Sequence, residues 1–169
     1  MTAEDFITDL QSSGFGDLPL IQAGGVGDAA GLSDCLELGY AGAQLGTRFL
    51  ATHECKITQS YKTAICGATS DDIVWTNKLA GTNSSVIRTP QVEEGGLRVG
   101  PITAWLLRNP YTKLLTRTYM LQNAIAVYKK AAFEEDCELW QAGKGVDSIE
   151  KVESCAEILA RFGEVARIE

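Results

Sequence analysis

Two short glycine-containing runs carry residue types that could bind a phosphate group. The first is Ala23-Gly24-Gly25-Val26-Gly27, and the second is Gln44-Leu45-Gly46-Thr47-Arg48-Phe49. Glycines leave the backbone amides unshielded and adopt positive φ readily, so a turn built from them can wrap an anion. The second run adds a threonine hydroxyl and an arginine charge. Together the two runs predict a phosphate site.

One strand–helix–strand unit is expected to position both runs. The apolar stretch 18–23 has the composition of a parallel strand buried on both faces. Asp28 can cap the helix that follows, and 41–45 is predicted to be the next strand. The two runs therefore end neighbouring strands, which is the arrangement in which barrel enzymes bind phosphate after their last two strands.

The remainder of the chain is predicted to be mainly helical, with one hairpin. The first helix is expected over 2–13, with Thr2 and Asp5 at capping-box spacing. The other elements are predicted from apolar periodicity and turn residues. They are helices over 55–68, 101–109, 111–132 and 150–167, and a hairpin of 73–77 with 85–89.

Composition limits the class of protein. The net charge of −7 argues against nucleic acid as the main partner. No apolar stretch approaches the length of a membrane span, and the acidic first residues differ from a secretory signal. The five cysteines form neither a CxxC pair nor a metal-ligand spacing, so a reducing compartment and no metal site are expected. A cytoplasmic protein without a membrane partner is the resulting prediction.

One basic segment interrupts this acidic chain. From 95 to 133 there are six basic residues and no acidic one, interleaved with Trp105, Tyr111, Tyr119 and Tyr128. The pattern fits a docking face for an acidic partner or a membrane surface. It equally fits a pair of surface helices whose aromatic side chains pack inward. The second interpretation is favoured because charged helix faces are usually only solvated.

At the two glycine runs the chain resembles the nitronate monooxygenase family, also called 2-nitropropane dioxygenases, and the related flavin-dependent enoyl-acyl-carrier-protein reductases. Residues 20–27 resemble the seventh strand and turn of that family's barrel, and 42–52 resemble the eighth strand. Residues 140–145 resemble the turn before its final helix. The match covers most of the chain.

The resemblance implies an α/β fold, namely the C-terminal portion of a (β/α)8 TIM barrel. About the last two βα units are expected, followed by a helical C-terminal extension. Residues 1–70 would hold the partial barrel units with the phosphate turns. Residues 71–169 would form the hairpin and the helical extension of the same domain.

The resemblance also implies FMN as the cofactor, contacted mainly through backbone amides. Arg48 could add positive charge there or form an ion pair at the barrel rim. The residues carried over as the FMN site are Gly24, Gly25, Gln44, Leu45, Gly46 and Thr47.

No catalytic residue can be assigned by this resemblance. The family's catalytic histidine lies on an earlier strand, and His53, the histidine present here, is expected to be a surface residue. Because two strands cannot close a barrel, self-association or a complementary chain is expected to supply the remainder.

Three functions stay open at this point. The first is oxidation of a small substrate, an alkyl nitronate, with oxygen. The second is flavin-dependent reduction of an enoyl thioester. The third is a degenerate barrel fragment without catalytic activity.

Overall fold

The computed structural model describes residues 3–166, and the capping-box threonine expected at position 2 lies outside this range. Three short helical turns accompany the helices and strands: η1 (Gln11–Phe15), η2 (Ser70–Asp72) and η3 (Lys144–Ser148). The helices are α1 (Ala3–Leu10), α2 (Ala29–Glu37), α3 (Thr47–Leu50), α4 (Gln59–Gly67), α5 (Pro90–Gly95), α6 (Pro101–Arg108), α7 (Lys113–Phe133) and α8 (Cys155–Ala166). The strands are β1 (Ile21–Ala23), β2 (Gly42–Gln44), β3 (Ile73–Thr76) and β4 (Ser84–Ile87).

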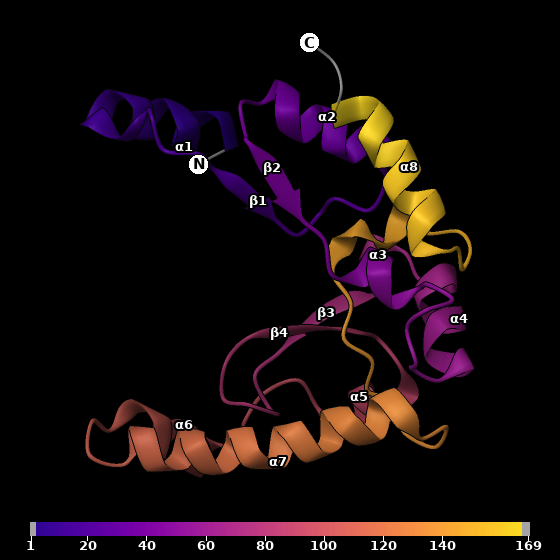
Figure 1. Cartoon of the computed structure of the whole chain (residues 1–169). Helices are drawn as coiled ribbons and strands as arrows, with labels where there is room; N and C mark the ends of the chain where they lie inside the picture. The colour runs from indigo at the N-terminus through magenta and orange to yellow at the C-terminus, as the bar shows by residue number, and fades with distance from the viewer. Residues whose placement is uncertain (1–2, 167–169) are drawn as a thin grey trace.

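The elements form two groups joined through α3, α4 and the segment around η3. Figure 1 shows β1 and β2 in the upper group with α1, α2 and α8, where α2 packs against both β2 and α8. The lower group contains the β3–β4 hairpin, α5, and the long helix α7 with α6 packed along it. The last helix therefore returns to the first strand–helix–strand unit.

The strand–helix–strand unit predicted from the sequence is confirmed. β1 and β2 pair in parallel, with Ile21 opposite Gly42 and Ala23 opposite Gln44. Between them, the Asp28 carboxylate accepts a hydrogen bond from the Gly31 amide at 2.8 Å and so caps α2. The two strands are three residues long each, shorter than the apolar stretches suggested.

The prediction that the first strand is buried on both faces is wrong. Ile21 is 57% exposed and Ala23 is exposed as well. The reason is that, within residues 3–166, this sheet has two strands only. A parallel strand becomes buried on both faces only when further strands and helices cover it.

Several helix boundaries differ from the expected ones because side chains cap the helices at other positions. α8 begins at Cys155 because Ser154 and Glu157 form a capping box. The Glu157 amide donates to the Ser154 hydroxyl, and the Ser154 amide donates to the Glu157 carboxylate. α4 begins after Thr58, whose hydroxyl accepts from the Tyr61 amide. α5 was not predicted, although Thr89 caps it and Pro90 opens it, as in many helices.

The aromatic residues of the basic segment do not all pack inward. Trp105 is 62% exposed, Tyr111 93% and Tyr119 65%, so the favoured interpretation is wrong for these three. α7 instead turns Met120 and Ala124 into the protein. Trp105 lies on α6, Tyr119 on α7 and Tyr111 in the connection between the two helices.

The core lies where the two groups meet. It contains Ala51 after α3, Tyr61 and Ile65 of α4, Ile73 and Ile87 of the hairpin, and Ala142, Val146 and Ile149 near η3. The Tyr61 ring stacks on Trp140 with centroids 5.9 Å apart, and its hydroxyl donates to the Gln141 carbonyl at 2.6 Å. Residues on both sides of position 70 thus share one core.

Truncating a fully buried core side chain should destabilise the chain. Ile65 is 0% exposed, so Ile65→Ala is expected to lower the free energy of unfolding by about 3 kcal/mol through lost contacts and a cavity. The matched control Ile125→Ala, at a position that is 47% exposed, should stay within about 0.5 kcal/mol of wild type. Urea denaturation followed by circular dichroism measures both, and equal losses would contradict this assignment of the core.

Candidate functional site

The two glycine runs lie side by side at one edge of the β1–β2 pair. Ala23 and Gln44 are register partners, so both strands end at the same level. One residue further, the Gly24 amide donates to the Gln44 carbonyl at 3.5 Å. The structure therefore brings together the residues that the sequence analysis grouped, with Gly24 and Gly25 on one turn and Gln44, Leu45, Gly46 and Thr47 on the other.

The first turn uses the backbone freedom of its glycines. Gly24 has φ +87° and Gly25 has φ +82°, values that other residues rarely adopt. Space around Gly24 is open, since a Cβ placed there would meet no atom within 4 Å. Both glycines are exposed, and no acceptor among residues 3–166 bonds the Gly25 amide. The turn consequently presents a donor to the space beyond the strand.

The second turn leads directly into a helix. Gly46 stands at the N-cap of α3 and is exposed, and Thr47 is the first helical residue. The first amides of a helix have no acceptor within it, so those of Thr47 and Arg48 remain available. The Thr47 hydroxyl accepts a hydrogen bond from the Gly143 amide at 2.9 Å. Thr47 thus links this turn to the segment before η3.

A third segment, residues 142–148, closes against the two turns. Gly145 packs on the first turn, where a Cβ would lie 3.2 Å from the Val26 carbonyl carbon. Gly27 lies so close to this segment that a Cβ on it would overlap the Gly145 carbonyl oxygen and the Ser148 hydroxyl. The sequence analysis missed the roles of Gly27, Gly143 and Gly145. The similarity of 140–145 to a family turn was the available signal.

Arg48 is buried and engaged in an ion pair. It is 3% exposed, and its Nη2 donates to the Lys151 carbonyl at 3.0 Å and lies 3.4 Å from Glu153 Oε2. Of the two roles left open for Arg48, the structure contains the ion pair.

Glu153 is the centre of this ion-pair network. Its carboxylate accepts two hydrogen bonds from Arg161, at 2.8 and 2.6 Å, and lies close to Arg48 and Lys151. The hydrogen bonds from Arg161, together with the neighbouring cations, lower the pKa of Glu153 to about 2. The network joins the rim of α3 to α8.

A polar cavity of about 350 Å³ lies beside the second turn. Its lining includes Thr47, Gly143, Trp75 and Gln141, together with Ser84 and Ser85 of the hairpin. His53 is not in this lining; it is exposed near α8, where its amide donates to the Glu153 carbonyl. Within residues 3–166, no three His, Cys, Asp or Glu side chains are grouped in a way that could hold a metal ion.

The sequence model of the nitronate monooxygenase family matches residues 3–164, nearly the whole chain. The chain belongs to the nitronate monooxygenase family. A probable nitronate monooxygenase of Bacillus subtilis is 28% identical over 147 residues, which cover 84% of this chain and 38% of the relative.

One further relative and one solved structure are also similar to this chain. The (3aS,4S,5R,7aS)-5-hydroxy-7a-methyl-1-oxo-octahydro-1H-indene-4-carboxyl-CoA dehydrogenase of Mycobacterium tuberculosis is 38% identical over 94 residues, or 54% of this chain and 26% of that protein. The structure of FabK from Thermotoga maritima superposes with a TM-score of 0.66 at 24% identity. The superposition covers 98% of this chain and 50% of the FabK chain, and it supports the α/β fold class.

This nitronate monooxygenase-family chain is shorter than its relatives. It spans between 18% and 38% of the length of the curated relatives it matches first. Among residues 3–166, no helix is both long and apolar enough to cross a membrane.

The contact between Gly27 and Gly145 should tolerate no side chain. Gly27→Ala is expected to lower the free energy of unfolding by about 1–3 kcal/mol, because its methyl group would collide with backbone atoms. The control Gly143→Ala adds the same methyl group 3.6 Å from the Thr47 hydroxyl, an ordinary contact, and should change stability by less than about 0.5 kcal/mol. Thermal unfolding compares the two; a stable Gly27→Ala protein would disprove the close packing.

The Glu153 network should make stability depend on acidic pH. Because the pKa of Glu153 is depressed from 4.5 to about 2, its contribution is complete above pH 4.5 and is lost as the pH falls toward 2. Glu153→Gln should therefore cost about 2 kcal/mol at pH 7, and the difference from wild type should shrink below pH 4.5. Glu164→Gln, on an exposed position of α8, serves as the control. A pH-independent difference would contradict the assigned pKa.

Proposed function

We propose that the two glycine turns hold the phosphate of FMN and that the chain is the flavin-phosphate part of a nitronate monooxygenase-type oxidoreductase. The observation that carries this proposal is the pair of positive-φ glycines, Gly24 and Gly25, placed beside Gly46 and Thr47 at one strand edge. Amides from both turns are unpaired there and can donate to the same anion. Gln44 and Leu45 complete the second turn.

The residues present fit a phosphate. None of the six proposed contact residues carries a negative charge, and the space around Gly24 is open. The Gly24 amide already donates to the Gln44 carbonyl, so the Gly25 amide is the available donor of this turn, and both glycines must remain without side chains for it to be approached closely. Charge-assisted hydrogen bonds from such amides contribute about 1.5–3 kcal/mol each.

We assign to Lys144 the positive charge that balances the phosphate. It lies between Gly143, which bonds Thr47, and Gly145, which packs on Val26. Lys144 is exposed and makes no ion pair within the described residues. Because Arg48 is committed to Glu153, the third segment supplies this charge in our proposal.

The chain's own residues bind and orient the cofactor, and they do not supply its base. When bound, FMN would accept electrons from an alkyl nitronate and pass them to oxygen. The cavity beside Thr47 has room for part of a small substrate, with Trp75 as an apolar wall and Ser85 and Gln141 as hydrogen-bonding groups. No histidine lines it, so the catalytic histidine is proposed to come from a complementary chain.

The partial-barrel arrangement belongs to the same proposal. The units at 1–70 would be the last two βα units of a (β/α)8 barrel, and 71–169 their hairpin and helical extension. The exposed edge of β1, with Ile21 57% exposed, supports this, because such an edge needs a neighbouring strand. A cytoplasmic location is proposed with it.

Reduction of a thioester substrate is the second candidate function. It is supported by the relative from Mycobacterium tuberculosis, whose name describes a carboxyl-CoA dehydrogenase. Oxygen uptake with propyl-2-nitronate would support the first function. Consumption of NADH with an enoyl thioester would support the second.

Binding of FMN tests the shared part of both candidates. Titration of the chain with FMN should quench flavin fluorescence, and Gly25→Asp should weaken binding by about 10- to 100-fold, because it adds a negative charge and fills the turn. Thr47→Ala and Lys144→Gln should each weaken binding by roughly tenfold.

Gly39→Asp is the matched control for Gly25→Asp. Gly39 also has positive φ, +94°, and open space around it, but it follows α2 at the opposite end of the unit. It adds the same strain and charge without touching the turns, so it should bind FMN as wild type does. Unchanged affinity in Gly25→Asp, or no binding by wild type, would reject the phosphate site and leave a fragment without flavin chemistry.

A further inference from the structure

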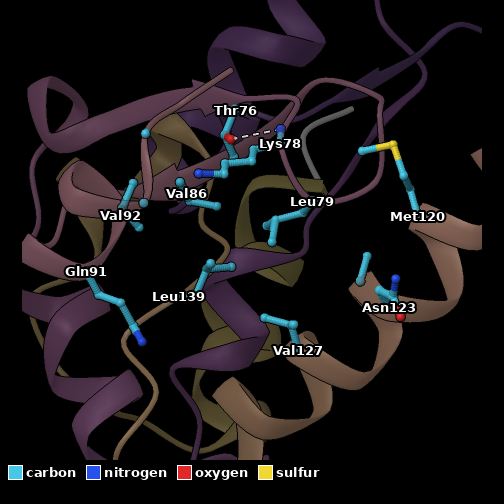
Figure 2. A pocket seen from close by; sticks show the side chains of 13 residues that line it. Thr76, Lys78, Leu79, Val86, Gln91, Val92, Met120, Asn123, Val127 and Leu139 are labelled. Carbon is cyan, nitrogen blue, oxygen red and sulfur yellow. Dashed lines mark hydrogen bonds between the residues drawn. The ribbon is translucent and has the colours of Figure 1, made fainter. Parts of the chain in front are cut away.

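A second cavity lies on the other side of the β3–β4 hairpin. It is about 330 Å³ in volume and is enclosed by the hairpin, α5, α7 and Leu139. Figure 2 shows Val86 and Val92 on one side of it and Val127 of α7 on the other, with Leu79 and Leu139 between. This volume is within the range of small-molecule sites.

The hairpin separates this cavity from the polar cavity beside Thr47. Adjacent residues of a strand point to opposite faces, and Trp75 lines the Thr47 cavity while Thr76 lines the second one. The two linings have no residue in common. A ligand in the second cavity is therefore distinct from one bound at the glycine turns.

The floor of the second cavity is apolar and buried. Val86 is 0% exposed, Ala124 1% and Val92 5%. The one hydroxyl on this floor, that of Thr76, already donates to the Leu97 carbonyl at 2.9 Å and accepts from the Lys78 amide at 3.2 Å. A molecule lying on the floor meets carbon atoms and no available hydrogen-bonding group.

An unoccupied apolar floor of this size also lacks favourable contacts. The cavity is partly open at its rim, and water molecules over its apolar floor find few hydrogen-bonding partners there. An empty cavity forfeits the dispersion contacts of its lining. An apolar group of roughly ten non-hydrogen atoms would restore those contacts.

The rim of the cavity is polar and carries one positive charge. Lys78, Gln91 and Asn123 line it and are exposed, and Figure 2 shows Lys78 beside Thr76 and Val86, with Gln91 and Asn123 at separate edges. Lys78 is the only charged residue of the lining. Within residues 3–166 no carboxylate forms an ion pair with it. The side-chain oxygen Oε1 of Gln91 accepts a hydrogen bond from the Glu138 backbone amide, and this bond holds the Gln91 side chain at the rim.

We propose that this cavity binds a small amphiphile with an apolar body and an anionic head, of the class of medium-chain carboxylates. The apolar body lies on Val86, Val92 and Ala124, and the carboxylate meets the Lys78 ammonium at the rim. This site requires no flavin.

Octanoate is the probe, because its ten non-hydrogen atoms match the cavity volume. Titration of the chain with carboxyl-labelled octanoate, followed by ¹³C NMR, should give a saturable site of one ligand per chain. Lys78→Gln should weaken octanoate binding by about tenfold but leave binding of octanol unchanged, since octanol lacks the charge. Lys113→Gln, a basic residue of α7 outside the lining, should have no effect.

Val127→Phe tests the apolar part, because the larger ring occupies the cavity from α7. It should reduce the affinity for both octanoate and octanol by at least tenfold. Ile125→Phe adds the same ring on an exposed face of α7 and should bind as wild type does. Circular dichroism would verify that both variants fold.

Two results would overturn the proposal. One is octanoate binding that does not saturate or is unchanged in Val127→Phe, and the other is equal loss in Lys78→Gln and Lys113→Gln. FMN titration of the same variants should give wild-type affinity. Failure of the octanoate site and failure of the flavin site are thereby measured separately.

Discussion

Backbone contact between the first glycine turn and the segment 142–148 is the constraint on which the rest of this structure depends. Gly27 and Gly145 approach so closely that neither position has room for a larger side chain without displacement. The Gly143 amide adds a hydrogen bond to Thr47 on the neighbouring turn. Because three chain segments meet at these atoms, the shape of the candidate phosphate site is determined by packing behind it.

The ion-pair network around Glu153 serves the same arrangement from the opposite side. Arg48 leaves the second turn and binds Glu153, which in turn binds Arg161 of α8. A buried carboxylate held by two guanidinium groups orients both elements, whereas its net contribution to stability is modest when desolvation is counted. The proposed phosphate site therefore uses backbone amides, because the Arg48 guanidinium is engaged with Glu153.

Local patterns predicted the parts of the fold that local interactions determine. The strand–helix–strand unit, the hairpin and the helix pair 101–132 follow from apolar spacing, from the Asp28 cap and from turn residues, and all are present. The prediction that β1 is buried was wrong, because burial of a strand depends on neighbouring strands that the pattern of 18–23 cannot reveal. The exposure of Trp105, Tyr111 and Tyr119 was missed for a similar reason, since tertiary packing decides which helix face is covered. Within the site, the partners Thr47–Gly143 and Arg48–Glu153 are about a hundred residues apart, and no spacing rule connects them.

That separation also sets the order in which the site can form during synthesis. Thr47 and Gly143 are 96 positions apart, and α8, which packs on α2, comes later still. As the chain leaves the ribosome, the two glycine turns emerge long before the segment that fixes them. Closing so large a loop is slow compared with forming a hairpin or a helix. The nascent chain therefore passes through a stage in which both turns exist but the segment that packs against them is not yet in place. On the proposed function, cofactor binding would be one of the last steps of its maturation.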